Sequence, residues 1–245
     1  MKRTVKIFLI AGAVILLPVL LSPLPRFNPP LSTVVEAKDG SLLGARIAED
    51  GQWRFPPSDE VADKFEKALL TFEDKYFYLH PGINPVSIIR ALSRNIKAGE
   101  IVSGGSTITM QVARLSAGNI KRSYGAKISE MLMALRLELS RSKRNILKTY
   151  MANAPFGGNI VGLDAASWRY LEKSPADITW AEAAALAVLP NSPSLVFPGK
   201  NQEILRERRD GLLSLMYERE YFDSLTLILS LDRKSTRLNS SHVSQ

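Results

Sequence analysis

The pattern of hydrophobic and polar residues predicts a small β region followed by a long helical one. Within residues 32–55, the runs TVVEA and LLGARIA flank Lys38-Asp39-Gly40-Ser41. An Asp-Gly pair between two such runs predicts a β hairpin. Beyond Pro57, apolar residues recur three or four positions apart, as they do on one face of a helix. The pattern therefore predicts a mainly α protein with a small N-terminal β hairpin.

Capping signals place the ends of the expected helices. Ser58-Asp59 is expected to start a first helix, and Asn84-Pro85 a second one that ends at Gly99. Later helices are expected around Ile128–Leu139, from Ser142 to Tyr150, after the capping box Thr179–Glu182, and from Asn201 to Glu218 as the last helix.

The N-terminus carries a membrane-targeting pattern. Lys2, Arg3 and Lys6 precede an apolar run over residues 7–21, and a Pro-rich stretch follows. This predicts a signal peptide or a signal anchor, and the absence of a convincing small-x-small cleavage site favours a single transmembrane anchor over residues 1–25. Its basic tip is expected in the cytoplasm and the rest of the chain outside. A buried core helix is the weaker interpretation, because no polar residues mark a second face.

Composition narrows the class of protein. The 245 residues contain no cysteine and two histidines, which excludes a disulfide scaffold, a thiolate zinc site and a cysteine nucleophile. The net charge of +8 favours an anionic partner. Export from the cytoplasm argues against nucleic acid as that partner.

A first candidate cluster is FEDKYFYLHPGINP, from Phe72 to Pro85. Glu73 lies among aromatic residues, which disfavour an ionised carboxyl and favour a role as general base. An ordinary solvated helix carboxylate is the competing interpretation. For His80, a turn histidine that bonds the backbone is as good an interpretation as a functional residue.

A second cluster is SGGSTITMQVARL, from Ser103 to Leu115. A Gly-Gly-Ser-Thr turn that opens a helix can bind an anion through backbone N–H groups and the hydroxyls of Ser106 and Thr107. Arg114 follows two helical turns later on the same face. As a generic pattern this turn is weak evidence.

A third cluster holds Lys127 and Glu130, which can share one helix face. An ordinary surface ion pair is the competing interpretation. Two carboxylates, Glu73 and Glu130, on different helices could also flank one cleft, as glycosyl chemistry requires. Spacing leaves this open.

Taken in order, the clusters resemble the motifs of the peptidoglycan glycosyltransferases, glycosyltransferase family 51. The family pattern EDxxFxxHxG is similar to residues 73–82, GGSTITQQ to residues 104–111, the Lys and Glu of RKxxE to Lys127 and Glu130, and ILxxYxN to residues 146–153. The stretch from Ala154 to Ser194 looks most like the 1C type of class A penicillin-binding protein. The resemblance covers about residues 30–232.

The resemblance implies a lysozyme-like helical bundle that polymerises lipid II into β-1,4 glycan strands and releases undecaprenyl pyrophosphate. It implies that Glu73 is the general base and that Glu130 assists the leaving pyrophosphate, directly or through a divalent cation. Such a cation would be Mg²⁺ or Mn²⁺ at the pyrophosphate, and the motifs by themselves require no cofactor. The implied substrate-binding residues are His80, Ser106, Thr107, Gln111, Arg114, Lys127, Tyr150 and Asn153.

The resemblance also implies a domain order and partners. We expect a linker and hairpin at 26–57, the glycosyltransferase domain at 58–218, the start of a linker to a transpeptidase domain at 219–232, and a non-native or disordered tail at 233–245. Expected partners are lipid II, the nascent glycan strand, the outer face of the cytoplasmic membrane, and cell-wall synthesis or division proteins.

Two departures from the family pattern keep other functions open. Met110 replaces the first glutamine of the usual pair, and Ala126 replaces the arginine before Lys127. The alternatives are a lysozyme-like lytic enzyme, or a non-catalytic scaffold that binds lipid II. Retention of Glu73 and Glu130 argues against the scaffold, and the anion-binding turn argues against the lytic enzyme.

Overall fold

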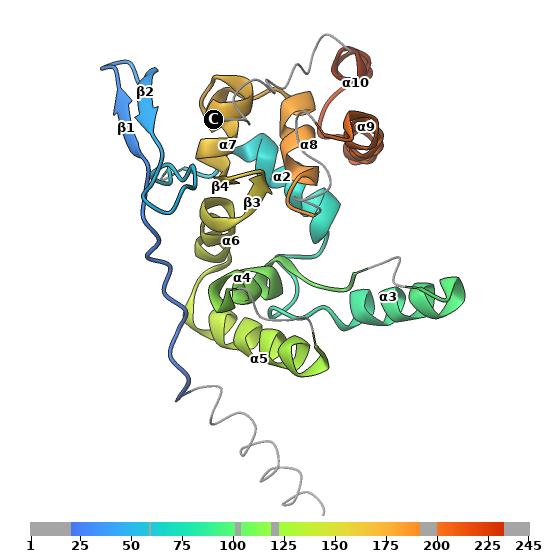
Figure 1. Cartoon of the computed structure of the whole chain (residues 1–245). Coiled ribbons are helices and arrows are strands. Elements are labelled where there is room, and N and C mark those ends of the chain that lie inside the picture. Colours follow the sequence, from blue (N-terminus) through green and yellow to red (C-terminus); the bar gives the residue numbers. More distant parts are fainter. Residues whose placement is uncertain (1–20, 59, 101–103, 119–122, 192–199, 233–245) are drawn as a thin grey trace, which may run out of the picture. The chain divides into compact units, whose positions relative to one another are not determined.

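The computed structural model describes residues 21–58, 60–100, 104–118, 123–191 and 200–232 (Figure 1). They form helices and two small antiparallel sheets, so the predicted mainly α fold with an N-terminal hairpin is confirmed. The predicted anchor falls mostly in residues 1–20, which lie outside this description. Among the helices that the structure describes, none has the length and apolar character needed to cross a membrane.

The chain divides into two compact units. Unit 1 combines the segment up to Phe27 with Phe77–Leu147, and unit 2 combines Asn28–Tyr76 with the chain from Lys148 onward. The expected 58–218 domain contributes to both units. Each unit is described below by itself.

The described residues of unit 1 form three helices and the start of a fourth. They are α3 (Pro85–Ala98), α4 (Ile108–Ala117), α5 (Tyr124–Ser140) and the first turns of α6 (Lys143–Asn153). Asn84 caps α3 by accepting a hydrogen bond from the Ser87 amide over 3.1 Å, and Gly99 ends it in the left-handed conformation. Both ends of this helix match the prediction.

Helices α4 and α5 pack on each other and form the core of unit 1. Ile108, Met110 and Val112 of α4 and Leu137 of α5 are fully buried. Side-chain caps begin both helices, at Thr107 and at Ser123. The first turn of each helix is therefore fixed, and these turns carry several of the predicted site residues.

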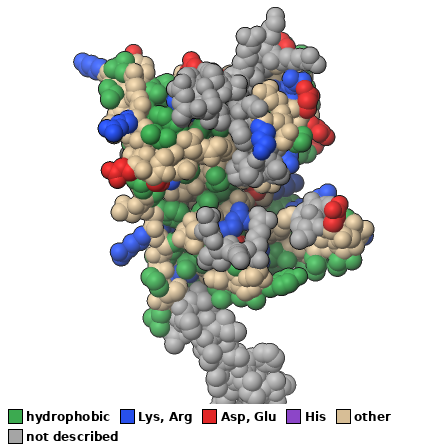
Figure 2. Space-filling model, in the orientation of Figure 1, with side chains coloured by type: hydrophobic (Ala, Val, Ile, Leu, Met, Phe, Trp, Pro, Cys, Tyr) green, Lys and Arg blue, Asp and Glu red, His purple; other side chains and the backbone are tan. Residues whose placement is uncertain are grey.

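The apolar stripe of α3 points to the surface. Val86, Ile89, Leu92 and Ile96 have exposed fractions between 58% and 71%, whereas Ala91 is buried. Figure 2 shows hydrophobic side chains along the lower border of this part of the molecule. The predicted periodicity is present, but the part of the chain that the structure describes leaves this face uncovered.

Unit 2 holds the two sheets and most of the other helices. The strands are β1 (Thr33–Glu36) paired with β2 (Leu42–Arg46), and β3 (Pro155–Gly157) paired with β4 (Ile160–Val161). The helices are α2 (Asp63–Glu73), α7 (Leu163–Leu171), the short 3-10 helix η1 (Pro175–Asp177), α8 (Trp180–Val188), α9 (Gln202–Tyr217) and α10 (Ser224–Leu231).

Helix α8 is the centre of unit 2. Every residue from Ala181 to Val188 is buried, and α8 packs against α2 and α9. Its many alanines let the neighbouring helices approach closely. The predicted capping box is confirmed, because Thr179 and Glu182 each bond the backbone of the other. Lys173 pairs with Glu182 over 3.0 Å and offsets the charge of this buried carboxylate.

One predicted helix start is wrong, and so is the prediction that the helix from Asn201 to Glu218 is the last one. Helix α2 begins at Asp63 rather than after Ser58-Asp59, because the Ser58 hydroxyl accepts the Glu60 amide in a local turn over 3.1 Å. The helix that ends at Tyr217 is followed by α10, which Asp223 caps by accepting the Thr226 amide over 2.8 Å. The segment expected to begin a linker is therefore largely helical.

Candidate active site

Ser106, Lys127 and Glu130 meet in unit 1. Lys127 Nζ donates hydrogen bonds to Ser106 Oγ over 2.5 Å and to Glu130 Oε2 over 3.0 Å. The predicted shared face of Lys127 and Glu130 is confirmed. The Glu130 side chain is only 15% exposed, and its partner lysine reaches a residue outside α5, so this is more than a surface ion pair.

The turn before α4 is held tightly in place. A Cβ atom on Gly105 would lie 2.9 Å from Ile88 Cα, so glycine permits the close approach of this turn to α3. Thr107 Oγ1 accepts the Met110 amide over 3.1 Å and donates to the Gly82 carbonyl over 2.6 Å. The Thr107 hydroxyl therefore has a structural role in this turn. Ser106 lies beside Lys127 at the positive end of the α4 dipole.

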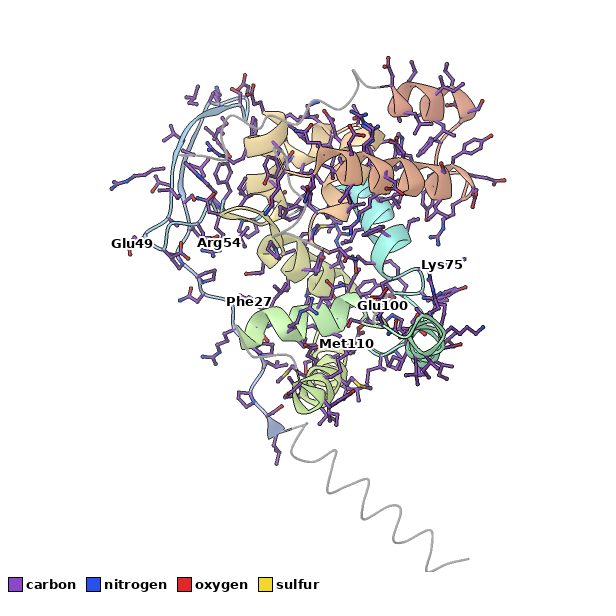
Figure 3. All side chains as sticks on the ribbon, turned by 45° about the vertical axis from the view of Figure 1, so that its right-hand side comes forward. Phe27, Glu49, Arg54, Lys75, Glu100 and Met110 are labelled. Carbon is purple, nitrogen blue, oxygen red and sulfur yellow. The ribbon has the colours of Figure 1, made fainter. Side chains whose placement is uncertain are left out.

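Helix α4 also carries Gln111 and Arg114. Gln111 is largely buried and Arg114 is half-buried. Met110, labelled in Figure 3, is fully buried. The Met110 position therefore contributes an apolar side chain to packing.

Glu73 lies in unit 2, at the last position of α2. Its Oε1 accepts a hydrogen bond from Asn191 Nδ2 over 3.1 Å. Asn191 comes shortly after α8, which packs beside α2. The amide therefore orients the carboxylate through helix packing within this unit.

Three other predicted site residues are buried or hydrogen-bonded within the protein. Tyr150 is 1% exposed, and Asn153 Nδ2 donates to the Thr149 carbonyl of its own helix over 2.9 Å. In unit 1, the His80 ring is buried edge-on against Phe77, with 6.4 Å between the ring centroids. The burial of His80 fits its interpretation as a turn residue.

The acidic side chains that the structure describes do not by themselves form a metal site. Among the described residues, no group of three or more His, Asp or Glu side chains could hold one. Glu130, the acidic member of the unit 1 cluster, is already paired with the ammonium of Lys127.

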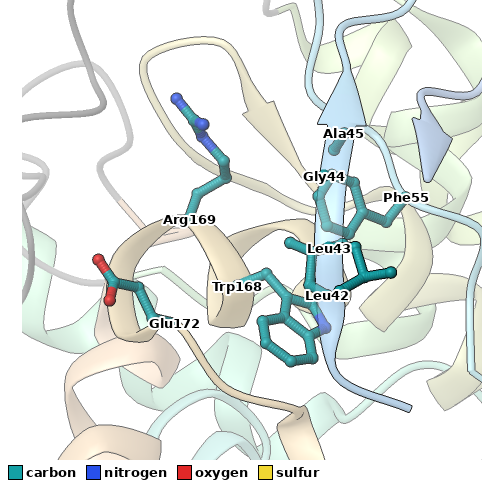
Figure 4. A pocket seen from close by; sticks show the side chains of 8 residues that line it. All are labelled: Leu42, Leu43, Gly44, Ala45, Phe55, Trp168, Arg169 and Glu172. Carbon is teal, nitrogen blue, oxygen red and sulfur yellow. The ribbon is translucent and has the colours of Figure 1, made fainter. Parts of the chain in front are cut away.

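A hollow of about 240 Å³ opens between β2 and α7 in unit 2 (Figure 4). Leu42, Phe55 and Trp168 give it apolar walls, with Arg169 and Glu172 among its other lining residues. None of the predicted site residues lines this hollow.

The sequence interpretation missed two residues that bond predicted site residues, and two more that are linked to one of them. Asn191 bonds Glu73, and Lys143 donates to the His80 carbonyl. Glu138 accepts hydrogen bonds from both Lys143 and Thr109. The sequence gives a signal for Lys143, because a cation at a helix start is disfavoured by the helix dipole and its presence there suggests a specific role. Asn191 has none beyond its place in a Pro-Asn turn.

The family model described as Transglycosylase matches residues 39–217 of this chain. The chain belongs to this family. The predicted family and the predicted enzyme class, a peptidoglycan glycosyltransferase, are both confirmed by this match together with the relatives described next.

The relatives are penicillin-binding proteins. Penicillin-binding protein 1C of Escherichia coli (strain K12) is 45% identical over 195 residues, which is 79% of this chain and 25% of that protein. Penicillin-binding protein 1F of Bacillus subtilis (strain 168) is 35% identical over 175 residues, 71% of this chain and 24% of that protein. The chain thus spans about a quarter of the length of these relatives.

Among solved structures, the 2.6 Å crystal structure of penicillin-binding protein 1A from Haemophilus influenzae aligns with a TM-score of 0.48 at 20% sequence identity. The alignment covers 87% of this chain and 22% of that one.

Proposed function

We propose that this chain polymerises lipid II into β-1,4 glycan strands and releases undecaprenyl pyrophosphate. The observation that carries the proposal is the Ser106–Lys127–Glu130 cluster at the start of α4. An ammonium, a hydroxyl and a helix N-terminus together favour a dianionic pyrophosphate. A hydrolase that cuts finished glycan would have no use for this set.

The proposed reaction gives a role to each carboxylate and to this cluster. The Glu73 carboxylate takes the proton from the 4-hydroxyl of the acceptor sugar. The oxygen then forms a bond to the anomeric carbon of the donor, with inversion, as the bond from that carbon to the lipid pyrophosphate breaks. Lys127 and Ser106 stabilise the charge that develops on the pyrophosphate, and Glu130 orients Lys127.

Asn191 has a supporting part in this mechanism. Its amide donates to Glu73 Oε1 and can favour the carboxylate that must accept a proton. Gln111, Arg114, Asn153 and the buried residues His80 and Tyr150 complete the proposed substrate-binding set.

The proposed setting is the outer face of the cytoplasmic membrane, where lipid II is presented. A signal anchor over residues 1–25 would fix the chain there. The exposed apolar stripe of α3 and the net charge of +8 are consistent with a substrate held at an anionic membrane. Interaction with other cell-wall synthesis or division proteins belongs to the same proposal.

The test is incubation of the detergent-solubilised full chain with labelled lipid II, followed by gel separation and muramidase digestion. The proposal expects long products that muramidase degrades, and none from Lys127→Met over the same time. Release of muropeptides from finished sacculi without polymerisation would instead establish a lytic enzyme. A folded chain that binds lipid II but makes no polymer would establish a scaffold.

A further inference from the structure

Glu138 and Lys143 occupy helix ends that do not suit their charges. Lys143 is the first residue of α6, where the positive end of the helix dipole disfavours a cation. Glu138 lies in the last turn of α5, where the negative end disfavours an anion. Both side chains are also largely buried: that of Lys143 is 20% exposed and that of Glu138 is 9% exposed. Both placements cost free energy, so other contacts must account for them.

Lys143 connects the turn after Phe77 to the α5–α6 junction. Its Nζ donates to Glu138 Oε1 over 2.8 Å and to the His80 carbonyl over 2.6 Å. The same ammonium lies 4.5 Å from the centroid of the Phe77 ring. One side chain thus contacts two residues of the segment Phe77–Gly82.

Glu138 extends this network to α4. Its Oε1 accepts a hydrogen bond from the fully buried Thr109 hydroxyl over 2.6 Å. A Cβ atom on Gly82 would lie 2.8 Å from both Glu138 Cγ and the Ala134 carbonyl oxygen, so this segment lies directly on α5. The Gly82 carbonyl then accepts from Thr107, the neighbour of Ser106.

A buried ion pair of this kind is poor evidence for stability. Its desolvation cost often cancels its Coulombic gain, and apolar side chains of similar size can replace such pairs without loss of stability. What the pair can supply is a defined geometry, because an ammonium and a carboxylate accept few arrangements of their partners.

We propose that Glu138 and Lys143 are positioning residues that set how Phe77–Gly82 lies on α4 and α5, and so hold Ser106 against Lys127. This rests on the proposed function, because the geometry that it protects is the pyrophosphate site. Neither residue contacts substrate in this account. Loss of the pair should therefore lower kcat for lipid II with little change in KM.

The deciding variant of the full chain replaces the buried polar trio by apolar side chains of similar size: Thr109→Val, Glu138→Leu and Lys143→Met together. We expect an unfolding temperature close to that of the parent and a kcat lower by about 10- to 100-fold, the loss that a small misplacement of reacting groups produces. Lys143→Arg, which keeps the charge and its donors, should recover most of the kcat. Lys67→Met is the matched control, because Lys67 pairs with Asp63 on the surface of α2.

A folded trio variant with the kcat of the parent overturns the proposal. If the trio variant does not fold, Glu138→Gln decides, since it keeps an acceptor oxygen but removes the charge. A folded Glu138→Gln chain should lose about 10-fold in kcat at unchanged KM. Parent-like kcat in that variant overturns the proposal.

Hydrogen exchange separates this inference from the proposed function. If the parent makes no polymer, the proposed function fails. The rate of amide hydrogen exchange in Glu138→Gln, compared with the parent, still tests the positioning role. Faster exchange confined to residues 77–84 and 104–110 supports that role. Unchanged exchange in both segments rejects it.

Discussion

Asn191 Nδ2 lies 3.1 Å from Glu73 Oε1 and joins two residues that are 118 positions apart in the chain. A carboxylate at the end of a helix can rotate freely unless a partner fixes it. Asn191 supplies such a partner within unit 2, which supports a role in orienting the proposed base.

Asn191→Ala should leave the base in place but remove one hydrogen bond that orients it. We expect kcat for lipid II polymerisation to fall about 3- to 10-fold, the loss that one hydrogen bond of about 1 kcal/mol produces. Asn191→Asp should lose more, because it replaces the donor by a second negative charge. Steady-state kinetics with both variants checks this, and equal rates for parent, Ala and Asp would refute the orienting role.

Lys127 should matter far more than a lysine of the same exposure elsewhere. The Lys127 and Lys67 side chains are both 39% exposed, and each pairs with a carboxylate on its own helix. Lys127→Met should lower the polymerisation rate by about 100- to 1,000-fold, as loss of a donor to developing charge does. Lys67→Met should change it less than about twofold. Similar effects of the two changes would argue against a phosphate site at Lys127.

Gly105 should tolerate no side chain, whereas Gly104 should accept one. The nearest atoms to a Cβ on Gly105 are the Ile88 Cα at 2.9 Å and the Ile88 nitrogen at 3.2 Å, and this backbone cannot move aside cheaply. Gly105→Ala should cost about 1–3 kcal/mol of unfolding free energy. A Cβ on Gly104 meets nothing within 4 Å, so Gly104→Ala should be close to neutral. Thermal unfolding of both variants gives the comparison, and equal midpoints would contradict it.

Asp164 should make the stability of the chain depend on pH. Burial raises the pKa of its carboxyl above the ordinary 3.8, although a backbone hydrogen bond from Ser58 acts in the opposite direction. A raised pKa in the folded state means that the contribution of Asp164 to stability is full below pH 3.8 and is lost as pH rises through the folded-state value.

Asp164→Asn removes this ionisation while it keeps an acceptor oxygen. The variant should therefore unfold at a higher temperature than the parent at pH 7.5, and the difference should shrink as pH falls toward 3.8. Scanning calorimetry at several pH values tests this. A difference that stays constant with pH would show that the ionisation of Asp164 is not its cause.

Local signals in the sequence predicted much of the fold. The Asp39-Gly40 turn, the Asn84 cap and the Thr179–Glu182 capping box act within a few residues, and the structure has each of them. Ser58 failed as a cap because its hydroxyl bonds the backbone two residues later, a choice that the pattern does not distinguish. Helix α10 was missed because its capping residue, Asp223, sits in a stretch that resembled a linker.

The candidate site could be predicted only in part. The pairing of Lys127 with Glu130 follows from helical spacing, but the contact of Lys127 with Ser106 spans 21 positions and depends on how α4 packs on α5. The same holds for Asn191 with Glu73, and for Glu138 with Thr109. Long-range contacts of this kind come from tertiary packing, which no local pattern encodes.

The most direct test of the central claim is the rate of lipid II polymerisation by Glu73→Gln beside Glu66→Gln. Both changes remove one carboxylate from α2 and keep the size of the side chain. The account predicts a loss of about 100- to 10,000-fold for Glu73→Gln, the usual contribution of a general base, with unchanged folding, and little effect for Glu66→Gln. Polymer formation by folded Glu73→Gln at the parent rate would contradict the assignment of Glu73 as the base.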